Sequence, residues 1–198
     1  MRATTGFFLT MAALLAGGCD RQSAGNGQGE VAAADNASAP APDEATAAPA
    51  QASAGTFDTS HKGEAAPAFA FADPTGKSVT LASYRGKPVL LNLWATWCAP
   101  CITEMPTLDA LAQRTAGKLQ VIALSQDLDA TKVAPFWTEQ GYKTLRPSTD
   151  PKIAFSTGLG ANLPTTILYD AQGKELWRFT GSTDWSGVEA GKQLASVL

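Results

Sequence analysis

The stretch Trp97-Cys98-Ala99-Pro100-Cys101 lies between a predicted strand and a predicted helix. The strand is the mostly apolar run Pro88-Val-Leu-Leu-Asn-Leu-Trp94, which has the length and composition of a buried strand. The helix is predicted from apolar residues at helical spacing, namely Cys101, Met105, Leu108 and Ala112. Pro100 suits the first turn of this helix, where its missing N–H costs nothing. The sequence therefore predicts a Cys-x-x-Cys motif at the point where a strand turns into a helix.

This placement is typical of a redox-active dithiol. Cys98 would lie at the helix N-terminus, where amide donors and the helix dipole stabilise a thiolate and lower the pKa of Cys98. Cys101 would lie in the first turn, close enough to attack a mixed disulfide and release the substrate. We therefore predict that Cys98 is the nucleophile and Cys101 the resolving thiol, joined as a redox-active disulfide in the oxidised form.

Two simpler interpretations of the motif remain open. A zinc site would need two further thiolate or imidazole ligands, and the other candidates are Cys19 and His61, both in the N-terminal region. A structural disulfide is the second alternative, although closing so short a loop gains little entropy. We predict no metal ion and no cofactor.

The longer segment Asn92-Leu-Trp-Ala-Thr-Trp-Cys-Ala-Pro-Cys-Ile-Thr-Glu-Met-Pro106 resembles the active-site segment of the thioredoxin superfamily. More narrowly, it resembles the membrane-tethered, TlpA-like reductases that include the cytochrome c maturation proteins. The resemblance extends over residues 64–198. It implies a thioredoxin-like α/β fold, with a central mixed sheet flanked by helices and an N-terminal hairpin extension. It also implies reduction of disulfides in protein substrates such as apocytochrome c, with a membrane thiol reductant as electron donor.

Composition limits the rest of the interpretation. The 198 residues suffice for one domain plus an extension, and all five tryptophans and three tyrosines lie after residue 80. The core must therefore lie in the C-terminal two thirds of the chain. The net charge of −3 gives no reason to expect nucleic acid as a partner.

The N-terminal region has the pattern of a secreted lipoprotein. Residues 1–18 combine a short basic start, a short apolar run and small residues, which predicts a signal peptide. Leu15-Ala-Gly-Gly-Cys19 resembles a bacterial lipobox, although leucine is one position further from the cysteine than usual. Cys19 would then carry lipid and hold the protein on a membrane of the bacterial cell envelope, facing the periplasm. Residues 19–62, rich in Ala and Pro, are predicted to form a disordered linker, and residues 63–198 the folded domain.

The folded domain is predicted to alternate strands and helices. We expect a hairpin from 68–71 and 79–81, further strands at 119–124, 163–169 and 174–179, and helices at 130–140, 150–157 and from 186 onward. Asp150 and Ser186 are the predicted N-caps of the last two helices. This order gives an α/β sheet covered on both sides, but the strand order comes only from the resemblance.

The resemblance also implies a substrate-binding edge. Pro164 matches the family's cis-proline, which lies against the active-site disulfide and leaves backbone free for substrate, with Leu163 beside it. Trp97 is expected to contribute to substrate binding as a cover over Cys98. Trp94 is expected to lie in the core.

The resemblance departs from thioredoxin at the position of the buried proton carrier. Thioredoxins have a buried aspartate six residues before the first cysteine, whereas this chain has Asn92, which cannot accept a proton. Attention therefore turns to Glu104, which matches the glutamate of the TlpA-like motif. Helical spacing places Glu104 at the half-buried edge of the apolar stripe, where desolvation and a thiolate would raise its pKa. We predict that Glu104 exchanges protons with Cys101.

Two other functions remain as alternatives. A peroxiredoxin-like peroxidase shares the fold, but that family places threonine three residues before its nucleophile, where this chain has Ala95. A non-enzymatic binding module is the second alternative, and the presence of both cysteines beside Pro164 argues against it. The direction of the redox reaction stays open, because dithiol potentials in this fold span roughly −270 to −120 mV.

Overall fold

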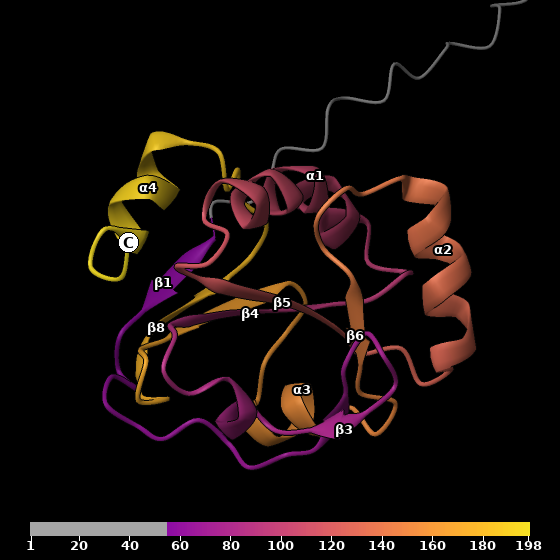
Figure 1. Ribbon diagram of the computed structural model, residues 1–198, viewed down its shortest axis with the longest axis horizontal. Coiled ribbons are helices and arrows are strands. Elements are labelled where there is room, and N and C mark those ends of the chain that lie inside the picture. Colours follow the sequence, from indigo (N-terminus) through magenta and orange to yellow (C-terminus); the bar gives the residue numbers. More distant parts are fainter. Residues whose placement is uncertain (1–54) are drawn as a thin grey trace, which may run out of the picture. The chain divides into compact units, whose positions relative to one another are not determined.

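The computed structural model describes residues 55–198 (Figure 1). The predicted signal peptide, the predicted lipid anchor at Cys19 and most of the predicted linker lie outside the described residues. Within residues 55–198, no helix is both long enough and apolar enough to cross a membrane.

The described residues form one eight-stranded mixed sheet with the order β1-β8-β7-β4-β5-β6-β2-β3. β5 pairs in parallel with β4 and with β6, and the other pairs are antiparallel. The strands are β1 (Thr56–Asp58), β2 (Phe71–Ala72), β3 (Ser78–Val79), β4 (Val89–Trp94), β5 (Gln120–Ser125), β6 (Pro147–Thr149), β7 (Thr165–Tyr169) and β8 (Glu175–Thr180). The helices are α1 (Ala99–Arg114), α2 (Val133–Gln140), α3 (Ala154–Leu159) and α4 (Val188–Leu194), with 3₁₀ turns η1 (Leu81–Tyr84) and η2 (Ala130–Lys132). The predicted α/β, thioredoxin-like architecture is confirmed.

β4 lies in the centre of the sheet, and all six of its residues are buried. Successive side chains of a strand point to opposite faces, so Leu90 and Trp94 join one core cluster and Leu91 and Leu93 join the other. The first cluster contains residues of α1, α2 and α4, and the second contains residues of η1 and α3. Figure 1 shows α1 above the sheet, α4 at the upper left, α2 on the right beside β6, and α3 below the sheet. Helices therefore cover both faces, and β4 points its C-terminal end at the Cys-x-x-Cys motif.

The predicted hairpin is present but shorter than expected. β2 and β3 are two residues each and flank a turn in which the Asp73 carboxylate accepts hydrogen bonds from the backbone of Thr75 and Lys77. Residues 68–70 are not in a strand, and Leu81 belongs to η1.

The predicted helix at 150–157 begins four residues late, at Ala154. Asp150 follows β6, a strand that the sequence pattern did not reveal, and its carboxylate accepts a hydrogen bond from the Phe155 amide at 2.9 Å. Ile153 lies in the left-handed region, with φ of 46°. Asp150 thus closes a turn before α3 instead of starting the helix at Pro151.

The last helix also begins late, at Val188. The predicted cap at Ser186 is wrong, because the Ser186 hydroxyl donates to Asp184 and the N-cap position is Gly187. Glu189 contacts Lys192 and Gln193 of its own helix.

The ordered domain begins before the predicted boundary at residue 63. Residues 56–58, assigned to the linker from composition, form β1 and pair with the edge of β8. Phe57 packs against Trp177, with ring centroids 5.1 Å apart. The packing of Phe57 and three backbone pairings with β8 therefore make residues 56–58 part of the folded domain, although the average composition of this segment predicts a linker.

Candidate functional site

The redox centre is the Cys98–Cys101 disulfide, with an S–S distance of 2.05 Å and Cα atoms 5.3 Å apart. Cys98 is the N-cap residue of α1, and its carbonyl accepts a hydrogen bond from the Ile102 amide at 3.1 Å. Only 5 % of Cys98 is exposed in this disulfide form, and Cys101 is fully buried. Cys98 is therefore the more accessible of the two cysteines.

A buried carboxylate holds the loop that leads to Cys98. Asp127 follows β5 and accepts hydrogen bonds from the Thr96 amide at 3.0 Å and from the Thr96 hydroxyl at 2.6 Å. Ser125 donates a third hydrogen bond to Asp127 at 2.7 Å. Because Thr96 lies two residues before Cys98, these contacts fix the backbone that presents the nucleophile.

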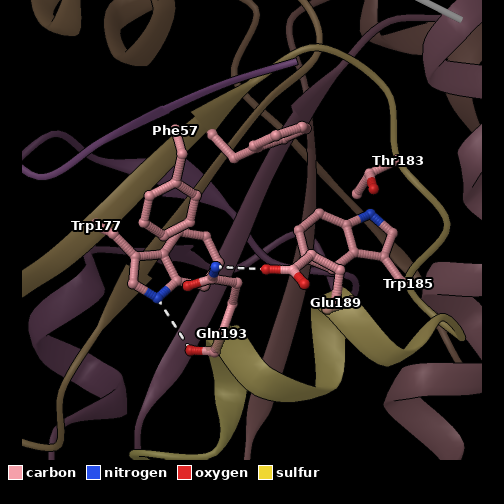
Figure 2. A pocket seen from close by; sticks show the side chains of 8 residues that line it. Phe57, Trp177, Thr183, Trp185, Glu189 and Gln193 are labelled. Atoms are coloured by element: carbon pink, nitrogen blue, oxygen red, sulfur yellow. Dashed lines mark hydrogen bonds between the residues drawn. The ribbon is translucent and has the colours of Figure 1, made fainter. Parts of the chain in front are cut away.

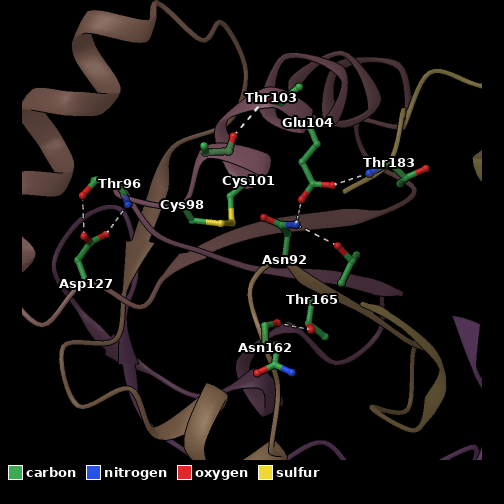
Figure 3. The surroundings of a disulfide bond; sticks show 12 residues. Asn92, Thr96, Cys98, Cys101, Thr103, Glu104, Asp127, Asn162, Thr165 and Thr183 are labelled. Carbon is green, nitrogen blue, oxygen red and sulfur yellow. Dashed lines mark hydrogen bonds between the residues drawn. A yellow bond between two sulfur atoms is a disulfide. The ribbon is translucent and has the colours of Figure 1, made fainter. Parts of the chain in front are cut away.

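The Leu163–Pro164 peptide bond is cis, as predicted for Pro164. The Pro164 carbonyl accepts a hydrogen bond from the Gly181 amide at 2.9 Å, which ties this peptide to the segment after β8. Figure 3 shows Asn162 and Thr165, which flank the cis peptide, in the surroundings of the disulfide.

An uncharged groove of about 640 Å³ lies beside the redox centre. Trp97, which is 70 % exposed, lines it together with Leu163 and with Leu128, which is 73 % exposed. None of the residues that line this groove, all within 55–198, carries a charge. Trp97 therefore lines an open, uncharged groove together with Leu163, the residue before the cis-proline.

Glu104 is buried, not half-buried as the helical spacing predicted, with 2 % of the residue exposed. Its Oε1 accepts a hydrogen bond from Asn92 Nδ2 at 2.8 Å. Its Oε2 accepts from the Thr183 amide at 3.1 Å and from Trp185 Nε1 at 3.2 Å. Figure 3 shows Asn92 and Glu104 on one side of the disulfide and Asp127 on the other.

Burial raises the pKa of Glu104 to about 7, although the hydrogen bonds from Asn92, Thr183 and Trp185 favour the charged form. The predicted direction and the predicted contribution of desolvation agree with this. A thiolate is not needed for the shift, because the structure is in the disulfide form. A carboxyl group with a pKa near 7 can both donate and accept protons at neutral pH.

A second pocket, of about 140 Å³, shares two residues with the Glu104 network (Figure 2). Thr183 and Trp185 line it, together with Phe57 of β1, Trp177 of β8 and residues of α4. The aromatic residues of β1 and β8 thus border the same pocket as the loop that donates to Glu104.

Sequence reasoning missed Asp127, Thr183 and Trp185. A signal for Asp127 existed, because Ser125-Gln-Asp127 directly follows a buried strand, and the carboxyl ends of neighbouring parallel strands meet at one edge. No local signal marks Thr183 or Trp185, which lie 79 and 81 residues from Glu104 in the sequence. The sequence shows that Asn92 cannot accept a proton, but nothing local in it indicates the contact between Asn92 of β4 and Glu104 of α1.

Residues 61–195 match the protein-family model described as Redoxin. The chain is 36 % identical over 121 residues to the thiol-disulfide oxidoreductase ResA of Bacillus anthracis, a match that covers 60 % of this chain and 69 % of that protein.

Solved structures of thiol–disulfide exchange proteins have the same fold as this chain. A protein from Chlorobium tepidum assigned as thiol:disulfide interchange protein DsbE superposes with a TM-score of 0.62 and 28 % identity, covering 69 % of this chain and 96 % of that one. A DsbF homologue from Corynebacterium diphtheriae superposes with a TM-score of 0.57 and 26 % identity, covering 72 % and 93 % of the two chains.

Proposed function

Because this chain belongs to the Redoxin family and is a thiol–disulfide oxidoreductase of the ResA and DsbE type, we propose that it reduces protein disulfides at a membrane facing the periplasm. The observation that carries the proposal is the Cys98–Cys101 disulfide at the N-terminus of α1. The uncharged groove beside it suits an extended polypeptide that carries apolar side chains next to its cysteine.

The reaction proceeds from the dithiol form by two exchange steps. The Cys98 thiolate attacks one sulfur of the substrate disulfide, forms a mixed disulfide and releases the other substrate sulfur as a thiolate. Cys101 then loses its proton and attacks Cys98 Sγ, which releases the second substrate thiolate and forms the Cys98–Cys101 disulfide. Two electrons pass to the substrate, and its two released thiolates take up from water two protons, equal in number to those that Cys98 and Cys101 gave up on forming their thiolates. A dithiol donor at the membrane returns the enzyme to its reduced form.

The direct test is stoichiometric reduction of insulin. Full-length protein, reduced with dithiothreitol and freed of it, is expected to reduce one disulfide per Cys98–Cys101 pair, measured by alkylation and mass spectrometry. The double variant Cys98→Ser/Cys101→Ser should reduce none. Equal insulin reduction by both proteins, or none by either, would overturn the proposed activity.

The proposed substrates include apocytochrome c, on the strength of the resemblance to cytochrome c maturation proteins. A peptide with an internal Cys-x-x-Cys-His disulfide should be reduced faster than insulin if this assignment is correct. An equal or slower rate would leave a general protein-disulfide reductase.

The proposed membrane attachment depends on Cys19, in the part of the chain that precedes the described residues. Cys19→Ser is expected to move the protein from the detergent-extracted membrane fraction to the soluble or signal-anchored fraction, because the acyl chains supply the membrane affinity. Reduction of insulin should be unchanged. Fractionation by centrifugation with immunoblotting measures the first effect, and wild-type protein found wholly soluble in the periplasm would refute the lipid anchor.

A further inference from the structure

Asn92 has a buried oxygen atom that no described group satisfies. The residue lies in the centre of β4 and is fully buried. Its Nδ2 donates to Glu104 Oε1 at 2.8 Å and to Thr166 Oγ1 at 2.9 Å, whereas its Oδ1 has no hydrogen-bond partner within residues 55–198. Because the amide nitrogen is the only donor of the Asn92 side chain and it faces Glu104, Oδ1 points away from that carboxyl group.

The direction of Oδ1 is toward the redox centre. Figure 3 shows the oxygen end of the Asn92 amide directed toward Cys101 and the nitrogen end toward Glu104. The contacts agree, because Cys101 and Glu104 are three residues apart on one face of α1 and Asn92 is bonded to Glu104. A disulfide has no hydrogen to donate, and an acceptor beside it therefore stays unsatisfied.

Reduction of the disulfide supplies a donor for Asn92 Oδ1. When the disulfide takes up two electrons and two protons, Cys101 gains an S–H group that can donate a hydrogen bond. We propose that Asn92 Oδ1 accepts a hydrogen bond from the Cys101 thiol in the reduced enzyme. Asn92 then stabilises the dithiol form and holds Cys101 as a thiol until Cys98 has formed the mixed disulfide. The consequence for turnover rests on the proposed function, but the hydrogen bond itself does not.

The sign of the effect on the redox equilibrium follows from the unsatisfied acceptor. A buried acceptor without a partner destabilises the form that contains it, here the disulfide. Asn92→Leu removes the acceptor with little change in volume and should shift the equilibrium with glutathione about tenfold toward the disulfide. This corresponds to a potential about 30 mV more negative. Thr166→Val is the matched control, because it removes another hydrogen bond of the same amide but leaves Oδ1, and it should shift the equilibrium less than about threefold.

A double-mutant cycle separates Cys101 from Glu104 as the target of Asn92. If Oδ1 acts on Cys101, the shift caused by Asn92→Leu persists in the Glu104→Gln background. If the shift disappears there, Asn92 acts only through Glu104 and the proposal is overturned.

A spectroscopic measurement tests the hydrogen bond with Asn92 in place, so it does not depend on whether Asn92→Leu folds. In Cys19→Ser/Cys98→Ser protein, Cys101 is the sole thiol, and its S–H stretching band should lie at lower wavenumber than that of the same chain unfolded in urea. A band at the unfolded position would refute the hydrogen bond. Insulin reduction is measured on the wild type in parallel, so that loss of the proposed function is distinguished from loss of this contact.

Discussion

Cys101→Ser is expected to accumulate covalent complexes with substrate proteins, whereas Cys98→Ser accumulates almost none. In the first variant the nucleophile at the N-terminus of α1 survives, and the thiol that would resolve the mixed disulfide is gone. In the second variant the remaining thiol is fully buried and does not meet substrate. We expect at least a tenfold difference in trapped substrate, measured after acid quenching and alkylation on non-reducing gels with mass spectrometry.

Both variants should be made with Cys19→Ser, so that the third cysteine contributes no adduct. Activity toward insulin should fall below detection in both, because each lacks one half of the dithiol. Equal trapping by the two variants would show that position at the helix terminus does not decide which cysteine attacks.

Glu104→Gln is expected to slow reduction of a protein disulfide about a hundredfold at pH 7, the size of a typical general acid–base contribution. Glu104 has a pKa of about 7 and lies three residues after Cys101, so it can take the proton that Cys101 loses in the resolving step. Stopped-flow measurements from pH 5 to 9 should show a titration near pH 7 in the wild type that the variant lacks. An unchanged rate and an unchanged thiol titration over this range would leave Glu104 with a structural role only.

The same residue gives a pH dependence of stability. The pKa of Glu104 is about 7 in the folded chain, against 4.5 for an ordinary glutamate, so the folded state binds the proton more tightly. Proton binding to Glu104 therefore stabilises the folded state. This stabilisation, about 3 kcal/mol, is fully present below pH 4.5 and is lost as the pH rises through 7. Urea unfolding at pH 5 and pH 8 should therefore show a larger loss of stability in the wild type than in Glu104→Gln. An equal loss in both proteins would mean that Glu104 is not protonated on folding.

Several features were accessible from the sequence because each depends on residues close together in the chain. The apolar run of β4, the helical spacing of α1 and Pro100 between the two cysteines are local patterns, and they predicted a dithiol at a strand–helix junction. The resemblance added the fold and the cis peptide before Pro164. The motif position and helical spacing of Glu104 predict its raised pKa, but they place it at a half-buried edge and not in the buried position that the structure shows.

The tertiary structure alone decided the surroundings of these residues. Glu104 is buried because a loop about 80 residues away covers it and supplies the Thr183 and Trp185 donors. β1 joins the sheet because β8 leaves an edge open beside it, and Asp127 reaches Thr96 because β4 and β5 run in parallel. Periodicity reports the face on which a side chain lies, but not which distant group will meet it there. The hydrogen-bond partners that set the protonation of Glu104 and the direction of the Asn92 amide therefore emerge only when the chain is folded.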